Sequence, residues 1–161
     1  MSNSNIDLAE IFKLAIKEHQ LGNYNEAEKL YKKILNKDSN HFESNFYLGT
    51  LYAQKNNLEE ALKLLNNAIE INSNVEDVHN NLGLIYRELG EYKKALKCLT
   101  KALKINPSYA EALNNLGFVY KEINEKEKAK KNFLKAIEIK PNYLEPYNNL
   151  GILFQEHGDF E

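Results

Sequence analysis

The residues of this chain best suited to forming intermolecular contacts are asparagines that come in pairs. The sequence Asn-Asn-Leu-Gly begins at Asn80, at Asn114 and at Asn148, so its three copies are equally spaced. A carboxamide offers a hydrogen-bond donor and an acceptor together, and it can pair with a peptide backbone without reading side chains. The pairs therefore indicate binding chemistry, and the elements that carry them decide what they can reach.

Residue types that catalyse reactions or hold metals are present, but they do not form catalytic arrangements. The four histidines, without paired ligand spacing, are His19, His41, His79 and His157. The single cysteine, Cys98, has no histidine or acid beside it at helical spacing, and one cysteine forms neither an intramolecular disulfide nor a multi-cysteine zinc site. No glycine-rich phosphate loop, H-E-x-x-H or G-x-S-x-G motif occurs. We therefore expect no catalytic residues, no metal and no cofactor, and we interpret the thiol as structural.

The composition limits the classes of molecule that we expect this protein to bind. Charged residues make up 27% of the 161 residues and the formal net charge is −2, which gives no sign of the clustered basic surface that nucleic acid requires. No apolar run approaches the length that a membrane span needs, and the N-terminus lacks the basic and apolar regions of a secretory signal. We expect neither nucleic-acid nor membrane partners. A lone cysteine fits a reducing compartment, so we expect a cytoplasmic location.

The periodicity extends well beyond the asparagines. Gly49, Gly83 and Gly117 each precede a tyrosine by three residues, and two alanines follow each glycine at constant spacing; they are Ala61 and Ala68, Ala95 and Ala102, and Ala129 and Ala136. The period divides the chain, without gap or insertion, into a tail over 1–7, repeats over 8–41, 42–75, 76–109 and 110–143, and a partial fifth repeat over 144–161. Self-similarity at a period of this length is the signature of a solenoid.

Within each repeat the spacing of apolar residues predicts two helices. In residues 76–109 the apolar positions recur at helical rather than alternating spacing. Gly90 lies between the two periodic stretches and suits a left-handed helix C-terminus. Gly83 and Ala95 allow the two helices to approach closely, where a larger side chain would overpack. We therefore expect an all-α chain of nine helices, arranged as four hairpins and one further helix.

Helix starts also repeat. Four residues suited to N-caps each stand three residues before an acid; the pairs are Asn40 and Glu43, Asn74 and Asp77, Ser108 and Glu111, and Asn142 and Glu145. We interpret them as capping boxes, in which the acid reaches back to the cap. This interpretation accounts for the four acids without a role in ligand binding.

These residues resemble the tetratricopeptide repeat. The Leu-Gly pair, the tyrosine after it, the two alanine positions and the closing Pro107 and Pro141 recur at the spacing of that family over residues 8–161. The first repeat departs most, with Ala15 where later repeats have glycine. The resemblance implies a right-handed α-solenoid of antiparallel helix-turn-helix hairpins, whose first helices line a concave groove. It also implies a non-catalytic role in holding peptides or partner proteins.

In the geometry of that family, the paired asparagines face the groove. The predicted peptide-binding residues are Asn80, Asn81, Leu84 and Arg87 in the third repeat, Asn114, Asn115, Phe118 and Lys121 in the fourth, and Asn148, Asn149 and Ile152 in the fifth. Asn81, Asn115 and Asn149 form a column that resembles the one in the repeat region of the protein O-GlcNAc transferases. Two alternatives stand beside this prediction. Asparagine is common at this position throughout the family and frequent in this chain, and the three apolar residues of the set would also fill the seam between first helices.

Three functional classes follow. The leading one is a non-catalytic scaffold that holds an extended protein or peptide segment in its groove. The second is the targeting or substrate-recruitment array of a larger enzyme, such as a glycosyltransferase, whose catalytic domain is not in this chain. The third is a self-association module that uses the C-terminal helix, where we expect Leu144, Leu150, Leu153 and Phe154 to be available to a partner. Residues 158–160 match the turn of a fifth hairpin, which favours a piece of a longer protein.

Overall fold

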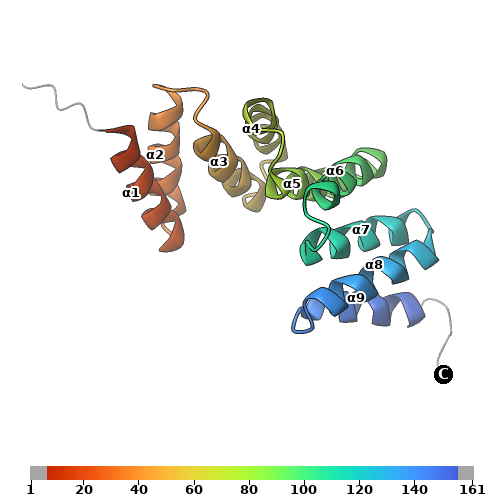
Figure 1. Ribbon diagram of the computed structural model, residues 1–161. Helices are drawn as coiled ribbons and strands as arrows, with labels where there is room; N and C mark the ends of the chain where they lie inside the picture. Colours follow the sequence, from red (N-terminus) through yellow and green to blue (C-terminus); the bar gives the residue numbers. More distant parts are fainter. Residues whose placement is uncertain (1–6, 156–161) are drawn as a thin grey trace, which may run out of the picture. The chain divides into compact units, whose positions relative to one another are not determined.

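The structure is a computed structural model that describes residues 7–155, and every regular element in that range is an α-helix (Figure 1). There are nine helices, so the predicted all-α chain of helical hairpins is confirmed for the described residues. The predicted turn at Gly158, with Asp159 and Phe160, lies outside that range, as do Glu156 and His157.

The helices belong to two compact units. Unit 1, Met1–Ser73, contains α1 (Leu8–Gln20), α2 (Tyr24–Leu35), α3 (Phe42–Gln54) and α4 (Leu58–Ile71). Unit 2, Asn74–Glu161, contains α5 (Glu76–Glu88), α6 (Tyr92–Ile105), α7 (Ala110–Glu122), α8 (Lys126–Ile139) and α9 (Leu144–Gln155). Odd-numbered helices are the first helices of their hairpins, and even-numbered helices are the second.

Small residues bring the two helices of a hairpin together, as predicted. A β-carbon built on Gly83 of α5 would lie 2.6 Å from Leu99 Cγ of α6. One built on Gly117 of α7 would lie 2.7 Å from ring carbons of Phe133 in α8. Both facing side chains are fully buried, so a substituent on either glycine would have to displace a packed core residue.

The turn inside each hairpin uses a left-handed residue. Gly90 has φ +70°, and the N–H of Glu91 donates to the carbonyl of Tyr86 at 2.8 Å, which is the bond pattern of a Schellman motif. The equivalent positions in the other turns also have positive φ; they are Gly22 (+78°), Asn56 (+58°) and Asn124 (+61°). The left-handed cap predicted at Gly90 is confirmed. Asparagine takes the same role in two turns because its short polar side chain tolerates this conformation better than most.

The predicted capping boxes are wrong. The N-caps of α5 and α7 are Val75 and Tyr109, one residue later than predicted, and neither side chain makes a capping hydrogen bond. Just before α7, Asn106 Oδ1 accepts from the N–H of Ser108 at 3.1 Å, so a side-chain turn two residues earlier orders this segment. The cap of α3 is His41, whose ring nitrogen accepts a backbone N–H.

In unit 2 the first helices form a layer of their own. Helix α7 packs against α5 on one side and α9 on the other, in addition to the contacts within each hairpin (Figure 1). Its buried residues include Leu113, Leu116 and Val119, and also Asn114 and Asn115. The middle first helix is therefore buried along the line where the asparagine pair lies.

Candidate peptide-binding site

The predicted binding residues of unit 2 come from its three first helices. We call the surface that they form the first-helix face: Asn80, Asn81, Leu84 and Arg87 from α5, Asn114, Asn115, Phe118 and Lys121 from α7, and Asn148, Asn149 and Ile152 from α9. Because α5, α7 and α9 adjoin in that order, the face runs across the three helices.

The paired asparagines bond to one another across neighbouring first helices. Asn115 Nδ2 donates to Asn80 Oδ1 at 2.9 Å, and Asn149 Nδ2 donates to Asn114 Oδ1, also at 2.9 Å. In both bonds the second asparagine of one pair donates to the first asparagine of the preceding pair. Asn114 also donates to the hydroxyl of Tyr143 at 3.3 Å. The structure thus gives a reason for the pair: α7 needs one amide for each neighbouring helix.

Burial differs sharply among these amides. Asn80, Asn114 and Asn115 are only 5%, 6% and 6% exposed, whereas Asn149 is half-buried and Asn148 is exposed. Buried amides normally have hydrogen-bond partners, and here they find them in one another. Within the first-helix face, the buried asparagines link neighbouring helices and the less buried asparagines lie closer to solvent.

Two cations lie over one aromatic ring on this face. The guanidinium carbon of Arg87 is 4.7 Å from the centroid of the Phe118 ring, and Lys121 Nζ is 5.1 Å from it. Arg87 Nη1 also lies 3.5 Å from Asn115 Oδ1, a long hydrogen bond. Lys121 forms an ion pair with Glu122 at 3.3 Å. The structure therefore brings together four predicted site residues from two helices: Arg87, Asn115, Phe118 and Lys121.

The three apolar residues of the first-helix face were expected either to contact a ligand or to fill the seam between first helices. Phe118 is half-buried and packs against the cluster that contains Phe133 and Leu150, so it fills the seam and supports the cations. Leu84 is half-buried as well. Ile152 is 44% exposed, and it is the member of the set most available for contact.

The acids at the helix starts connect successive hairpins. The hydroxyl of Tyr109 donates to the carboxylate of Asp77, and Lys140 Nζ lies 2.6 Å from Glu111. Burial, followed by that hydrogen bond to Asp77, raises the pKa of Tyr109. Burial, the largest single influence, would raise the pKa of Glu111, but the hydrogen bond from Lys140, a hydrogen bond to the backbone of Glu111 itself and the charge of Lys140 together outweigh it, so the pKa is lowered. Asp77 and Glu111 therefore stabilise the packing of hairpins by bonds that reach forward to the next connection.

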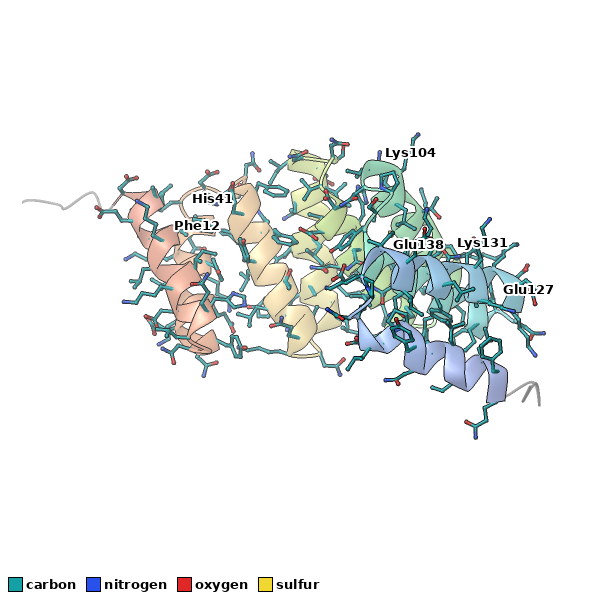
Figure 2. All side chains as sticks on the ribbon, turned by 60° about the horizontal axis from the view of Figure 1, so that its bottom comes forward. Phe12, His41, Lys104, Glu127, Lys131 and Glu138 are labelled. Atoms are coloured by element: carbon teal, nitrogen blue, oxygen red, sulfur yellow. The ribbon has the colours of Figure 1, made fainter. Side chains whose placement is uncertain are left out.

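Sequence reasoning missed an aromatic cluster in unit 1. The rings of Phe12 and His41 lie 5.2 Å apart and next to each other in Figure 2, and those of Phe46 and Tyr47 are also 5.2 Å apart. Tyr31 stacks on Tyr47 at 6.1 Å and is fully buried, while the other four rings are half-buried. Edge-to-face and offset contacts of this kind stabilise beyond the area that they bury.

The repeat register contained the signal for this cluster. Phe12 lies two repeats before Asn80 and Phe46 lies one repeat before it, and Tyr47 lies one repeat before Asn81. Aromatic residues therefore occupy three of the four corresponding positions in unit 1, and Lys13 occupies the fourth. A repeat period is recognised by residues that recur, so it does not reveal a position whose chemistry changes from one repeat to the next.

Reactive groups elsewhere show no arrangement for catalysis in the part of the chain that the structure describes. Cys98 is half-buried, and burial raises the pKa of its thiol, which is the opposite of the shift that activates a nucleophile. Burial lowers the pKa of His19, whose Nδ1 lies 3.2 Å from the Tyr31 hydroxyl. Among residues 7–155 no group of three or more histidine, cysteine or acidic side chains could hold a metal ion. None of the helices in that range combines the length and the apolar character that crossing a membrane requires.

Comparisons with known proteins agree with this architecture. Family models described as TPR repeat and tetratricopeptide repeat match residues 83–124 and 110–143, and the model of anaphase-promoting complex, cyclosome, subunit 3 matches residues 20–102. These matches, together with the helical hairpins, define a helical-repeat protein. Residues 83–143 carry tetratricopeptide repeats, and the helical hairpins of the described residues are of the same type.

Similar solved structures belong to the same class. A crystal structure of MamA protein is 26% identical, with a TM-score of 0.82, and the match covers 94% of this chain and 82% of that one. A second crystal structure of MamA is 28% identical, with a TM-score of 0.80 and coverage of 89% and 84%. YrrB, titled a TPR protein with an unusual peptide-binding site, is 22% identical, with a TM-score of 0.79 and coverage of 96% and 80%. A search of the curated proteins found no match.

Proposed function

We propose that this protein is a non-catalytic scaffold that binds an extended protein or peptide segment on the first-helix face of unit 2. The observation that carries the proposal is the grouping of Arg87 and Lys121 around Phe118, with Ile152 exposed on the adjoining helix α9. Cations and apolar carbon at one surface can bind the polar and apolar parts of a peptide together. The likeness to YrrB, which is described as a TPR protein with an unusual peptide-binding site, supports the same assignment.

The asparagines have two roles in this proposal. Asn80, Asn114 and Asn115 form the floor of the site and keep its helices in register through their mutual bonds. Asn149 is half-buried and donates one amide hydrogen to Asn114, so its oxygen and second hydrogen are left for the backbone of a bound segment. The column resembles that of the protein O-GlcNAc transferase repeats, and backbone binding by its less buried members is part of this proposal.

The test uses peptide pools and a matched pair of surface variants. We expect a pool of random heptapeptides, acetylated and amidated at their ends, to shift the NMR signals of α5, α7 and α9 and leave those of α8 unchanged. Ile152→Ser should weaken the interaction, because it removes exposed apolar carbon from the face. Leu134→Ser is the control, since Leu134 is 49% exposed on the second helix α8. Equal weakening by both variants, or shifts spread over both layers, would contradict the proposed site.

Self-association is a second candidate, favoured by the exposed apolar side chains of α9. Leu144, Tyr147 and Phe154 are 69%, 45% and 37% exposed. The expectation that Leu150 and Leu153 would also be available is wrong, because both pack against Ala129 and Phe133 of α8 and are buried. They are the core face of α9.

Sedimentation equilibrium over a range of concentrations tests this candidate. A monomer–dimer equilibrium that Tyr147→Ser shifts towards monomer would support it. Leu134→Ser, which removes a comparably exposed apolar side chain from α8, is the control. A monomer at all concentrations would refute it.

A further inference from the structure

Arg87 is a cation without an acidic partner among the residues that the structure describes. It lies in the last turn of α5, is half-buried, and forms no ion pair within residues 7–155. Its contacts are the face of Phe118 and the long hydrogen bond to Asn115 Oδ1. Removing a guanidinium partly from water without a counter-charge costs free energy, so the arrangement invites an anion.

Two other cations of unit 2 have acidic partners. Lys140 is paired with Glu111 at 2.6 Å and Lys121 with Glu122 at 3.3 Å. Lys121 shares the Phe118 ring with Arg87, so two positive charges flank one aromatic group, and one of them is paired with an acid. Of the two cations at the Phe118 ring, Arg87 is therefore the one without an acidic partner among the described residues.

The chemistry of arginine indicates which anion fits. A guanidinium presents five N–H donors in a planar fork, and its one described hydrogen bond, to Asn115, uses only one of them. A carboxylate matches two of these donors with two parallel bonds. A phosphate group, with nearly twice the charge, would need further free cations, whereas Lys121 already shares its charge with Glu122.

We propose that Arg87 anchors the carboxylate of an aspartate or glutamate side chain within the bound peptide. This inference rests on the proposed function, since it specifies which segment the first-helix face selects. The ring of Phe118 holds the guanidinium in place from one side, and Asn115 orients it through Oδ1. A ligand with an acidic residue completes the ion pair that the protein lacks.

The experiment compares two peptide pools that differ at one central position. Heptapeptides with three random residues on each side of a fixed Glu or a fixed Gln are acetylated and amidated, so a fixed glutamate adds one side-chain carboxylate to an otherwise equal pool. Binding of each fluorescein-labelled pool is measured by anisotropy with the wild-type protein and with Arg87→Gln. The control variant is Lys131→Gln, which removes one positive charge from the exposed side of α8 (Figure 2).

We expect the Glu pool to bind wild-type protein about tenfold more tightly than the Gln pool, as a charge-assisted hydrogen bond allows. Arg87→Gln should abolish that preference and Lys131→Gln should keep it. Equal binding of both pools to wild-type protein would overturn the acidic anchor while leaving the scaffold proposal standing. Loss of the preference in both variants would assign it to overall charge and also overturn the anchor. If neither pool binds, both proposals fail.

Discussion

Replacing Gly151 by alanine should stabilise the protein, and the same replacement at Gly117 should destabilise it. The two glycines lie one repeat apart, at equivalent positions of α9 and α7. A β-carbon on Gly151 meets nothing within 4 Å, whereas one on Gly117 meets Phe133 ring carbons at 2.7 Å. Alanine at position 151 therefore meets no clash, whereas alanine at position 117 must displace the Phe133 ring.

The magnitudes follow from two terms. Alanine is more favourable than glycine inside a helix by about 1 kcal/mol, and this gain applies to both sites. Overpacking of a filled core costs roughly 1–3 kcal/mol, and it applies only to Gly117, because Phe133 is fully buried and its ring must shift as a whole. The difference between the variants isolates the overpacking term. Gly151→Ala should gain up to about 1 kcal/mol, and Gly117→Ala should lose up to about 2 kcal/mol.

Urea denaturation followed by circular dichroism measures both variants. Hydrogen exchange in α9 is a second readout, because repeat arrays do not always unfold as one cooperative unit. A double-mutant cycle with Phe133→Leu completes the test, since leucine faces the equivalent glycine in other hairpins, as Leu65 faces Gly49. In that background the penalty of Gly117→Ala should shrink. If Gly117→Ala matched or exceeded Gly151→Ala in stability, close helix approach would not be what this position requires.

Three further outcomes are expected. Asn114→Ala should lower the free energy of unfolding by about 1–3 kcal/mol, because it removes the hydrogen-bond acceptor of Asn149 in α9. Asn148→Ala, at the equivalent but exposed position, should change the free energy of unfolding by less than about 0.5 kcal/mol. Urea denaturation midpoints of the two variants make the comparison. Hydrogen bonds from two lysines hold the pKa of Glu28 at about 2, so the stability that it contributes is present above about pH 4.5 and is lost as the pH falls towards 2. Glu28→Gln should therefore lower the urea midpoint at pH 7, and the difference from wild type should close near pH 2; a constant difference across that range would contradict the shift. Gly90→Ala should cost roughly 1–2 kcal/mol at its positive φ, and an unchanged thermal midpoint would show that the turn relaxes.

The hairpin architecture was predictable because its determinants are local and repeated. The close approach of Gly83 to Leu99 and the positive φ of Gly90 can be met by few residue types. The equivalent positions of the other repeats therefore hold the same residue or one of a few alternatives. Caps were predicted less well. Several side chains can order the start of a helix, and here the turn centred on Asn106 replaced the cap expected from Ser108.

The candidate site was predictable in location and less so in detail. Periodicity placed Arg87, Phe118 and Lys121 on one side of their helices, and the structure brings the three together. Periodicity could not show that the Asn115 side chain would be 6% exposed and hydrogen-bonded to Asn80. Burial of an amide depends on how closely two helices pack, and that distance is set by residues elsewhere in the interface.

The pairing of asparagines follows from what a middle helix requires. Helix α7 has neighbours on two sides, and one buried carboxamide can face only one of them. Asn115 donates to α5 and Asn114 accepts from α9, so the two adjacent residues meet both neighbours. Hydrogen bonds between buried amides fix the relative positions of helices more narrowly than apolar contacts do, because an offset would leave each amide unsatisfied. In unit 1, Phe12 and Phe46 occupy the equivalent positions, and aromatic rings tolerate a range of offsets. The same register therefore specifies alignment by hydrogen bonds in unit 2 and by ring packing in unit 1.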